Sequence, residues 1–497
     1  MALFVVTAAA SFYMFTTINR SFFPAEDIGS MMVSTQGSQD ASFDAMKTLQ
    51  LKAQSIIMAN KAVAHSTAIL RNNSNSGFLF VQLKPLGTRP AMGVVLAQLR
   101  KSLAEVPGLK SFVTPSTSIR FGGRATQSQY QLVLQSVDAT VARDWAAKLQ
   151  NAMTADTATF ADVATDYQDK ALQASVVVDR DAASRLGVTS AALRSTLEAG
   201  FGTYVPTQIQ TTGSSYNVIL EYDPAFQWTE MALADLKVPS TSGTLVPLSS
   251  FATVTRTAGP VSVNQTGQLT AVTLSFNLPA GVSLGTATAR IDQMKAQLGM
   301  PQTVLTSYAG AAALFQQSSG NTGLLIFAAV LTIYVVLGVL YESFIHPITI
   351  LSGLPSAALG SLIALEMFGF DLSIIALIGL LMLIGIVKKN AIMMIDVALV
   401  LRREEGMNAV DAIRIAAARR FRPIMMTTFC ALLGVLPIAL GTGASSELRQ
   451  PLGVAVAGGL VVSQALTLFI TPVIFVQIEA LSAWVSRVVL RRRDAAI

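Results

Sequence analysis

Long apolar runs fill the last third of this 497-residue sequence. A helix that crosses a lipid bilayer needs about 20 mostly apolar residues. Five runs meet that length, at about residues 322–341, 348–367, 373–400, 424–441 and 452–476. Charged residues make up only 13% of the sequence, against about 25% in soluble domains, so we predict a multi-pass α-helical membrane protein.

A sixth apolar run covers residues 1–18 and is slightly short for a span. A signal peptide is the alternative, but its positive charge would precede the apolar run, whereas Arg20 follows it. We therefore interpret residues 1–19 as a first transmembrane helix with a clipped start. Five more transmembrane helices are predicted within 322–480, followed by a basic cytoplasmic tail at 481–497.

Arginines gather on one side of the six predicted spans. One group lies between the fourth and fifth spans, and the other lies in the tail: Arg402, Arg403, Arg414, Arg419, Arg420, Arg422, Arg487, Arg491, Arg492 and Arg493. Segments rich in Lys and Arg near spans face the cytoplasm. Both termini are therefore predicted on the cytoplasmic side of the inner membrane of a Gram-negative bacterium, with residues 20–321 in the periplasm. These arginines account for the net charge of +6, so no nucleic-acid partner is predicted.

The stretch between residues 20 and 321 alternates short β-branched runs with helical ones. Its first part is predicted as strand 31–35, helix 42–59, strands 63–70 and 78–83, helix 91–104 and strand 112–120. This is the βαββαβ order of a ferredoxin-like unit. A second such unit begins with strand 130–135, helix 139–153 and strand 160–165, and ends with strand 271–276, helix 285–298 and strand 303–308.

An insert interrupts the second unit. It contains a predicted strand at 175–179, a helix at 189–199 and a hairpin at 204–210 and 215–222. We therefore predict an α+β periplasmic domain of two ferredoxin-like units, at 20–121 and at 122–173 plus 268–310, with the insert at 174–267. Two unrelated α+β domains are the alternative from the pattern alone.

Two adjacent lysines, Lys388 and Lys389, lie near the middle of the predicted span 373–400. Each would cost about 2.5 to 3.5 kcal/mol at a helix centre, so an acidic partner is expected. Snorkelling to the membrane interface is the alternative, but the interface is over ~15 Å away along the helix. The acids of this chain are poor candidates, because they lie at span ends or on the same helix: Glu342, Glu366, Asp371 and Asp396. We expect the partner on another polypeptide or on a missing half.

Other chemistry is sparse in this sequence. Cys430, the single cysteine, lies in an apolar run, and His65 and His346 are far apart. No disulfide, metal site or cofactor is therefore predicted. No nucleophile or phosphate motif indicates an enzyme.

Four motifs carry a resemblance to a known family: LIGIVKKNAIMMID at 383–396, RRFRPIMMTT at 419–428, SELRQPLG at 446–453 and FNLPAGVSL at 276–284. Over residues 22–493 the chain resembles the hydrophobe/amphiphile efflux branch of the resistance-nodulation-division (RND) transporters. The last two motifs resemble a subunit type from pumps built of two different transporter subunits. The resemblance implies drug/proton antiport by a secondary transporter.

The resemblance also implies an assembly. The family's full chain has twelve spans in two repeats, and the N-terminal repeat is missing here. The two ferredoxin-like units are similar to porter subdomains, whose facing cleft admits lipophilic small molecules, and the insert is similar to the docking subdomain. Segment 201–216 corresponds to the hairpin that reaches a neighbouring protomer of a trimer. A periplasmic adaptor protein and an outer-membrane channel are the further partners implied.

Family site residues carry over at matching positions. Lys389, followed by Asn390, aligns with the family lysine, which would pair with aspartates of the missing half, while the doubled Lys388 departs from the usual pattern. Thr427 matches the family threonine, and Arg420 lies at the cytoplasmic end of its span. Threonine in a span also bonds its own helix, and arginine also anchors the interface, so structural roles are the alternatives.

Two phenylalanines are the predicted substrate-binding residues. Phe78 and Phe80 alternate with Leu79 on a strand of the first unit, and Phe80 matches a family pocket position. An ordinary core role is the alternative for both.

Three other functions compete with drug export. One is a membrane assembly or regulatory half-subunit without a transport cycle, which the missing acidic pair would suit. Another is export of metal or other substrates, although the methionines gather mainly in the spans. A protein-translocation motor of a related kind is the third, but its periplasmic portion is smaller.

The predicted orientation can be tested with a cysteine placed at Gly213, within the predicted periplasmic portion. We expect a membrane-impermeant thiol reagent to label this cysteine in cells with an intact inner membrane, because the arginine clusters lie on the opposite side. Labelling only after the inner membrane is permeabilised would contradict the topology.

Overall fold

The computed structural model describes residues 2–24, 26–70, 75–119, 122–123, 126–223, 233–260, 262–279, 281–442 and 445–494, except for the side chains of 319 and 482–494. The chain forms two compact units. Met1–Gly37, Ser42–Asp166 and Asn264–Ile497 make the first, and Ser38–Ala41 and Tyr167–Val263 make the second.

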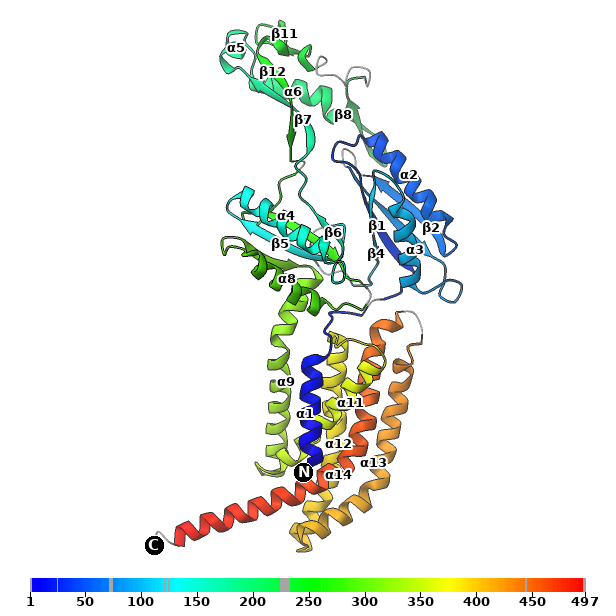
Figure 1. The fold of residues 1–497 in the computed structure, drawn as a ribbon, viewed down its shortest axis with the longest axis vertical. Coiled ribbons are helices and arrows are strands. Elements are labelled where there is room, and N and C mark those ends of the chain that lie inside the picture. The colour runs from blue at the N-terminus through cyan, green and yellow to red at the C-terminus, as the bar shows by residue number, and fades with distance from the viewer. Residues whose placement is uncertain are drawn as a thin grey trace. The chain divides into compact units, whose positions relative to one another are not determined.

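The first sheet consists of β1 (Ser30–Gln36), β2 (Val63–Leu70), β3 (Ser76–Leu83) and β4 (Lys110–Pro115). All its pairings are antiparallel, in the order β2-β3-β1-β4. Helices α2 (Phe43–Ala59) and α3 (Met92–Ala104) cover one face (Figure 1). The predicted strand 112–120 instead ends at Pro115, since proline cannot donate to a ladder.

Alternating side chains build the core of this sheet. Val33 on β1 pairs with Leu79 on β3 and with Val113 on β4, and all three are fully buried. Their alternate neighbours point to the opposite face. Ser42 caps α2 by accepting a hydrogen bond from the N–H of Ala45. Met46 and Ile57 then place the apolar face of that helix on the sheet.

The second sheet repeats this element order. Its elements are β5 (Tyr130–Ser136), α4 (Ala139–Ala155), β6 (Ala161–Thr165), β14 (Leu269–Asn277), α8 (Leu284–Leu298) and β15 (Leu305–Ala309). Strand β14 pairs with both β5 and β6, β15 pairs with the other edge of β5, and the short β13 (Gln265–Thr266) also pairs with β14. Because β6 and β14 pair directly, the chain leaves and re-enters this sheet at neighbouring strand ends.

Asp166 fastens the place where the second compact unit is inserted. Its carboxylate accepts a hydrogen bond from the N–H of Thr273 at 2.7 Å and another from the side chain of Asn264 at 2.8 Å. Asn264 is the first residue after the insert. The two ends of the insert are thereby tied to the same strand.

The second unit is built on strands β7 (Ala171–Val178) and β12 (Ala252–Gly259), which pair along their whole length. It also contains α5 (Arg180–Arg185), α6 (Ser190–Phe201), β10 (Lys237–Pro239) and β11 (Leu245–Pro247). Its core includes Val238, Leu248 and Phe251. Apart from Ser38–Ala41, the unit runs from Tyr167 to Val263, and it overlaps most of the predicted insert 174–267.

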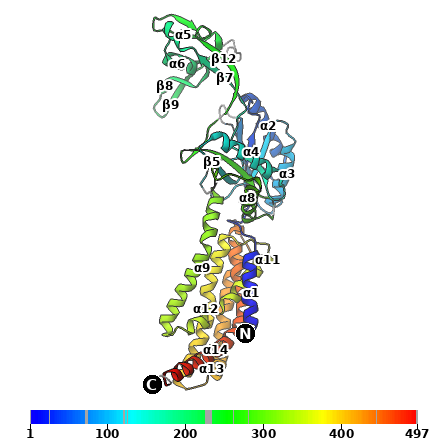
Figure 2. The same ribbon diagram turned by 60° about the vertical axis from the view of Figure 1, so that its left-hand side comes forward.

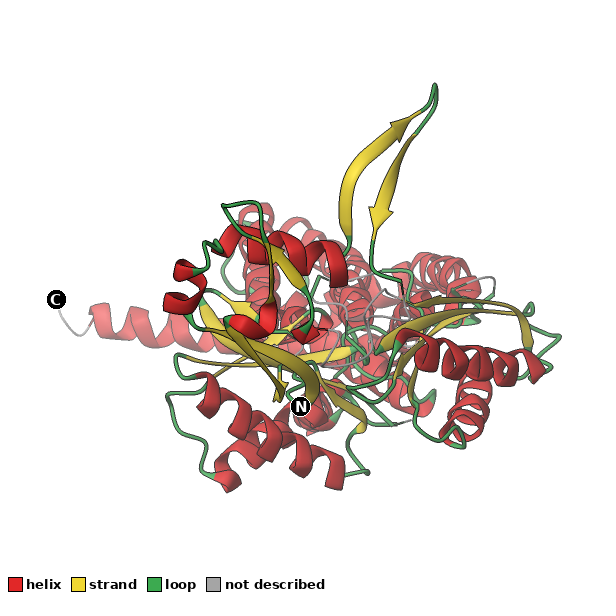
Figure 3. Ribbon diagram, turned by 90° about the horizontal axis from the view of Figure 1, so that it is seen from above, coloured by secondary structure: helices red, strands yellow, loops and turns green. Residues whose placement is uncertain are grey.

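Strands β8 (Tyr204–Gln210) and β9 (Ser215–Leu220) form a hairpin in this unit. It projects away from the helices and strands of its own unit (Figure 3). Its side chains are almost all exposed, including Ile209 and Tyr216.

The remaining helices form a bundle (Figure 2). They are α1 (Ala2–Thr17), α9 (Ala311–Tyr341), α10 (His346–Leu351), α11 (Leu354–Met367), α12 (Ile374–Glu404), α13 (Ala409–Ala439) and α14 (Ser446–Asp494). Within the described residues, five segments are long and apolar enough to cross a membrane: Gly320–Tyr341, His346–Met367, Ile374–Glu404, Ala409–Ala439 and Ser446–Leu481. Helix α1 has 16 residues and is shorter than these.

Helix α13 starts earlier than the predicted span 424–441. Asn408 caps it by accepting a hydrogen bond from the N–H of Asp411 at 2.8 Å. Arg414 and Arg420 therefore lie in the first half of α13, and the connection between α12 and α13 is short.

The linker from α1 to β1 is joined to the start of α12 by backbone hydrogen bonds. The N–H of Leu372 donates to Asn19, and the N–H of Ile374 donates to Phe22. The neighbouring Asp371 is half-buried, and burial raises the pKa of its carboxyl despite a hydrogen bond from Ser21. The linker therefore runs directly against the helix that carries the two lysines.

Asp27 anchors the far end of this linker. Arg89 donates two hydrogen bonds to its carboxylate, at 2.5 and 2.9 Å. Burial alone would raise the pKa of Asp27, but the hydrogen bonds from Arg89, Gly29 and Met92 and the charge of Arg89 lower it overall. The carboxylate therefore stays ionised and holds the linker at the start of α3.

Small residues allow α11, α12 and α14 to approach closely. A Cβ at Gly360 would lie 2.7 Å from the carbonyl oxygen of Gly458, and one at Gly459 would collide with Leu383. Ser361 donates to the carbonyl oxygen of Ala455 at 2.7 Å. Close backbone packing and such bonds hold membrane helices together in place of the hydrophobic effect.

We expect Gly360→Val to destabilise the bundle by about 1 to 3 kcal/mol, as is typical of overpacking. The thermal unfolding midpoint of the detergent-purified chain measures this loss. Gly434→Val on α13 is the matched control, because nothing lies within 4 Å of a Cβ there. Equal midpoints for the two variants would show that the α11–α14 contact is not tight.

Candidate functional site

Helix α12 divides the predicted site residues between two faces. Lys388 and Asn390 are buried, with 3% and 8% of their surface exposed, while Lys389 is exposed. The exposed positions recur at helical spacing: Ile378, Met382, Gly385, Lys389, Asp396 and Val400. We call this set the exposed stripe of α12.

Lys388 is satisfied within this chain by a backbone oxygen. Its Nζ donates to the carbonyl oxygen of Ile350 at 2.6 Å. Ile350 lies on α10, just before a turn at Ser352 and Gly353 that separates α10 from α11, and Pro355 follows in the first turn of α11. Carbonyl groups at the end of a helix attract cations. The acidic partner expected for this lysine is replaced by that carbonyl.

Lys389 has a different environment. None of the ion pairs within the described part of the chain includes it. It lies in the middle of a span whose exposed residues are mostly apolar, such as Met382, with Asp396 two turns further along the same stripe. An ammonium group facing hydrocarbon at this depth is costly. Lys389 thus lies on the exposed stripe of α12 without an ion-pair partner among the described residues.

A hydrogen-bonded polar cluster lies behind the lysines and joins three helices. Asn390 on α12 donates to Thr428 on α13 at 3.0 Å and to Gln464 on α14 at 2.9 Å. Thr428 also donates to Gln464 at 2.8 Å. Polar side chains in membrane bundles commonly bond across helices in this way. We call these three residues the polar cluster.

The structure separates Thr427 and Arg420 from this cluster. The Thr427 hydroxyl donates to Ile424 of its own helix at 3.1 Å, and Arg420 is exposed on α13. Asn390 and Thr427 were both predicted to supply hydrogen bonds to a polar path, and Asn390 bonds to Thr428, the neighbour of Thr427. Sequence reasoning overlooked Thr428 and Gln464, although a glutamine inside the predicted span 452–476 was an available signal.

Phe78 and Phe80 share one face of the first sheet. Phe80 is 43% exposed, Phe78 is half-buried, and Leu79 between them faces the helix-covered core. Thr114 lies on the same face as Phe80, since both are aligned with Met32 of β1. The Asn277 side chain donates to Thr114 at 3.4 Å. The face that carries both phenylalanines therefore contacts the second sheet.

These features place the chain in a known class. Residues 1–479 match the AcrB/AcrD/AcrF family, and the chain belongs to that family. The predicted resemblance is thus confirmed.

The relatives are multidrug resistance proteins. MdtC of Salmonella typhi is 43% identical over 486 residues, which are 97% of this chain and 47% of that protein. MdtC of Escherichia coli O6:H1 is 42% identical over 488 residues, which are 98% of this chain and 48% of that protein. The chain spans about half the length of these relatives, and the matched part is their C-terminal half.

Solved structures share the fold. A crystal structure of a heavy metal efflux pump aligns with a TM-score of 0.83 at 24% identity, covering 96% of this chain and 50% of that one. A second crystal form of a heavy metal efflux pump gives a TM-score of 0.82. At this identity the likeness concerns the fold alone.

The polar cluster predicts that replacing two adjacent threonines lowers the stability of the chain by different amounts. Thr428→Val removes the hydroxyl that bridges Asn390 and Gln464, so we expect a loss of roughly 1 kcal/mol in stability. Thr427→Val is the matched control and should cost less, because its hydroxyl only bonds its own helix. Thermal unfolding of the purified chain compares them, and equal shifts would contradict a cross-helix role for Thr428.

Proposed function

We propose that this chain is the C-terminal half of a proton-driven RND exporter of lipophilic small molecules. Drug/proton antiport is the reaction. Support comes from family membership and from MdtC relatives that are 42 to 43% identical over nearly the whole chain. These relatives favour a transporting half over a regulatory subunit.

The observation that carries this proposal is the exposed stripe of α12. It presents Lys389 from the centre of an apolar helix, where an uncovered ammonium is costly. An N-terminal RND half, or a partner RND subunit, would cover the stripe and supply the carboxylates that Lys389 requires. Lys388 needs no such partner, since the carbonyl oxygen of Ile350 accepts its hydrogen bond.

Coupling between proton binding and movement of α12 follows from the charge on Lys389. A carboxylate beside this ammonium stays ionised, and one separated from it in a low-dielectric bundle takes up a proton. A shift of α12 therefore changes the affinity of the opposing carboxylates for protons. Binding and release of protons on opposite sides of the membrane would then drive that shift in one direction.

The polar cluster would carry this movement to the neighbouring helices. Asn390 follows Lys389 directly and is bonded to α13 and α14 through Thr428 and Gln464. A displacement of Lys389 therefore strains bonds to both helices. Thr427 and Arg420 lie on α13 and would line the proton path on its exposed side.

We assign substrate binding to the first and second sheets. We interpret them as ferredoxin-like porter subdomains, with Phe80 and Phe78 lining the face that receives a lipophilic compound. The second compact unit would be the docking subdomain that meets an outer-membrane channel, together with a periplasmic adaptor. The exposed β8–β9 hairpin would reach a neighbouring protomer of a trimer in the inner membrane.

The decisive variant is Lys389→Ala in a complete pump reconstituted from this chain and a matching N-terminal half. Drug-driven proton flux should be lost, because the opposing carboxylates would stay protonated without the ammonium. Protein level and assembly should stay near normal, since the Lys389 side chain is exposed in this chain. Lys389→Arg should also lose most flux, because the two cations differ in geometry.

Lys388→Ala is the matched control at the adjacent position. It should lower thermal stability, because it removes a buried donor, yet flux per folded pump should persist. Normal flux in Lys389→Ala would refute the assignment, and loss in Lys388→Ala alone would move the role to Lys388. The chain expressed alone sets the baseline in a pump-deleted strain, and drug resistance without a partner would overturn the half-pump proposal.

A further inference from the structure

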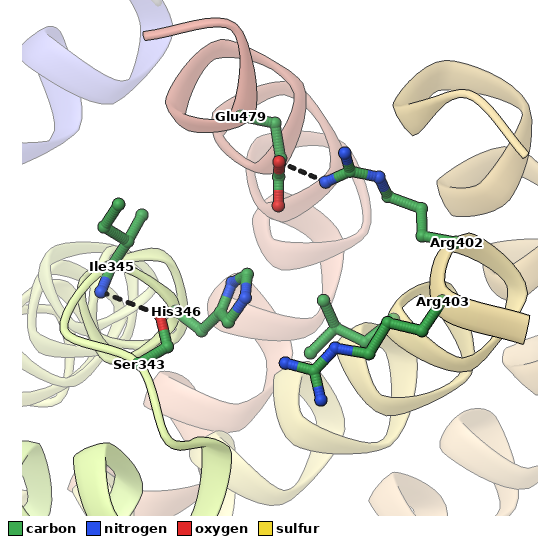
Figure 4. Close-up of a pocket in the computed structure, with 7 residues that line it drawn as sticks. Ser343, Ile345, His346, Arg402, Arg403 and Glu479 are labelled. Atoms are coloured by element: carbon green, nitrogen blue, oxygen red, sulfur yellow. Dashed lines mark hydrogen bonds and ion pairs between the residues drawn. The ribbon is translucent and has the colours of Figure 1, made fainter. Parts of the chain in front are cut away.

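A cavity of about 320 Å³ lies at the opposite end of α12 from the linker, beside its last turn. Its walls come from the connection before α10, from the end of α12 and from α14 (Figure 4). The lining residues are Ser343, Ile345, His346, Leu399, Arg402, Arg403 and Glu479. Ligand sites begin at about 300 Å³, so the space suits one small group.

The charges around this cavity do not cancel. Arg402 forms an ion pair with Glu479, whose side chain is 14% exposed. Arg403 takes part in none of the ion pairs within the described residues. Figure 4 shows the Arg403 guanidinium and the His346 ring on the same side of the Arg402–Glu479 pair. The cavity therefore carries at least one uncompensated positive charge.

Apart from Glu479, whose carboxylate is paired with Arg402, the polar side chains that line the cavity can donate hydrogen bonds. Arg403 offers a planar set of N–H groups, which suits bidentate binding of a phosphate. Ser343 accepts a hydrogen bond from the N–H of Ile345 at 3.2 Å, so its hydroxyl hydrogen remains free to donate. Nearby donors and a net positive charge select an anion with several acceptor oxygens, and a phosphate has this chemistry.

The surroundings favour a phosphate that carries an apolar tail. Phe344, beside the lining Ser343, is 80% exposed, and Leu340 and Ile348 are 65% and 52% exposed. Leu340 and Ile348 lie at the ends of two apolar spans, and Phe344 lies in the connection between them. A free phosphate would make no use of them, whereas acyl chains would cover them.

We propose that this cavity binds the headgroup phosphate of an anionic phospholipid from the surrounding leaflet. The proposal rests on the membrane placement within the proposed function, and it adds a lipid ligand to it. Arg403 contacts the phosphate, His346 and Ser343 complete the donor set, and the acyl chains lie against Leu340, Phe344 and Ile348. Basic pockets between membrane helices bind anionic headgroups elsewhere.

Native mass spectrometry of the detergent-purified chain measures bound lipid directly and requires no transport. Phosphatidylglycerol should be retained in preference to phosphatidylcholine, which has no net charge. Arg403→Gln should weaken retention of phosphatidylglycerol about tenfold, which corresponds to ~1.4 kcal/mol. Glu479→Gln should strengthen it, because Arg402 would lose its ion-pair partner and turn to the phosphate.

Two variants control for folding and for general charge. Arg414→Gln removes an exposed arginine of α13 that does not line the cavity, and it should leave retention unchanged. Arg403→Lys keeps the charge and should keep most of the binding, with size-exclusion profiles checking that each variant is folded.

Three outcomes would overturn the proposal. One is equal retention of phosphatidylglycerol and phosphatidylcholine. Another is equal retention in Arg403→Gln and the unaltered chain. The third is displacement of the lipid by millimolar inorganic phosphate, which would identify the free anion as the ligand. None of these results depends on whether the chain transports protons.

Discussion

An ammonium group inside a membrane must find an electron-rich partner, and helix α12 carries two such groups side by side. Lys388 finds its partner in the carbonyl oxygen of Ile350, 2.6 Å away. That contact requires α10 to end beside the middle of α12, which the turn before Pro355 allows. Lys389 belongs to the exposed stripe and has no ion-pair partner among the described residues. The helix therefore has one face whose polar groups are bonded within this chain and one face that this chain leaves exposed.

The other helices of the bundle also differ in how much of their apolar surface is buried within this chain. Half or nearly half of the apolar window is buried in three segments, His346–Met367, Ile374–Glu404 and Ser446–Leu481, against 6% in Gly320–Tyr341 and 11% in Ala409–Ala439. Close glycine contacts join the first three segments to one another, as at Gly360 and Gly459, and Gly453 of α14 makes a further close contact with Ile438 and Ala439 at the end of α13. Helices α9 and α13 leave most of their apolar surface exposed in this chain. The polar cluster joins α13 to α12 and α14, and Gln450 of α14 donates to the carbonyl oxygen of Ala439 at the end of α13.

Local patterns predicted most elements, and tertiary constraints explain the exceptions. Alternation and helical spacing located the strands and helices of both sheets within a few residues, because each has one core face. The apolar runs located five spans, but α13 begins well before residue 424. Arginines in its first half interrupt the apolar run from which the span was predicted. The partner of Lys388 could not be predicted, because every residue has a backbone carbonyl and the sequence does not show which one lies near the lysine. Thr428 and Gln464 were missed because their pairing depends on the angular position of three helices.

The insertion of the second unit between two paired strands bears on the order in which the chain folds. Strands β6 and β14 are far apart in sequence, and closing a long flexible loop before they pair costs entropy. The second unit has its own core, and the pairing of Ala171 with Gly259 brings its two ends together. Once that unit has folded, Thr165 and Leu274 are joined by a short effective tether instead of about a hundred free residues. Early folding of the inserted unit therefore accelerates completion of the sheet that surrounds it.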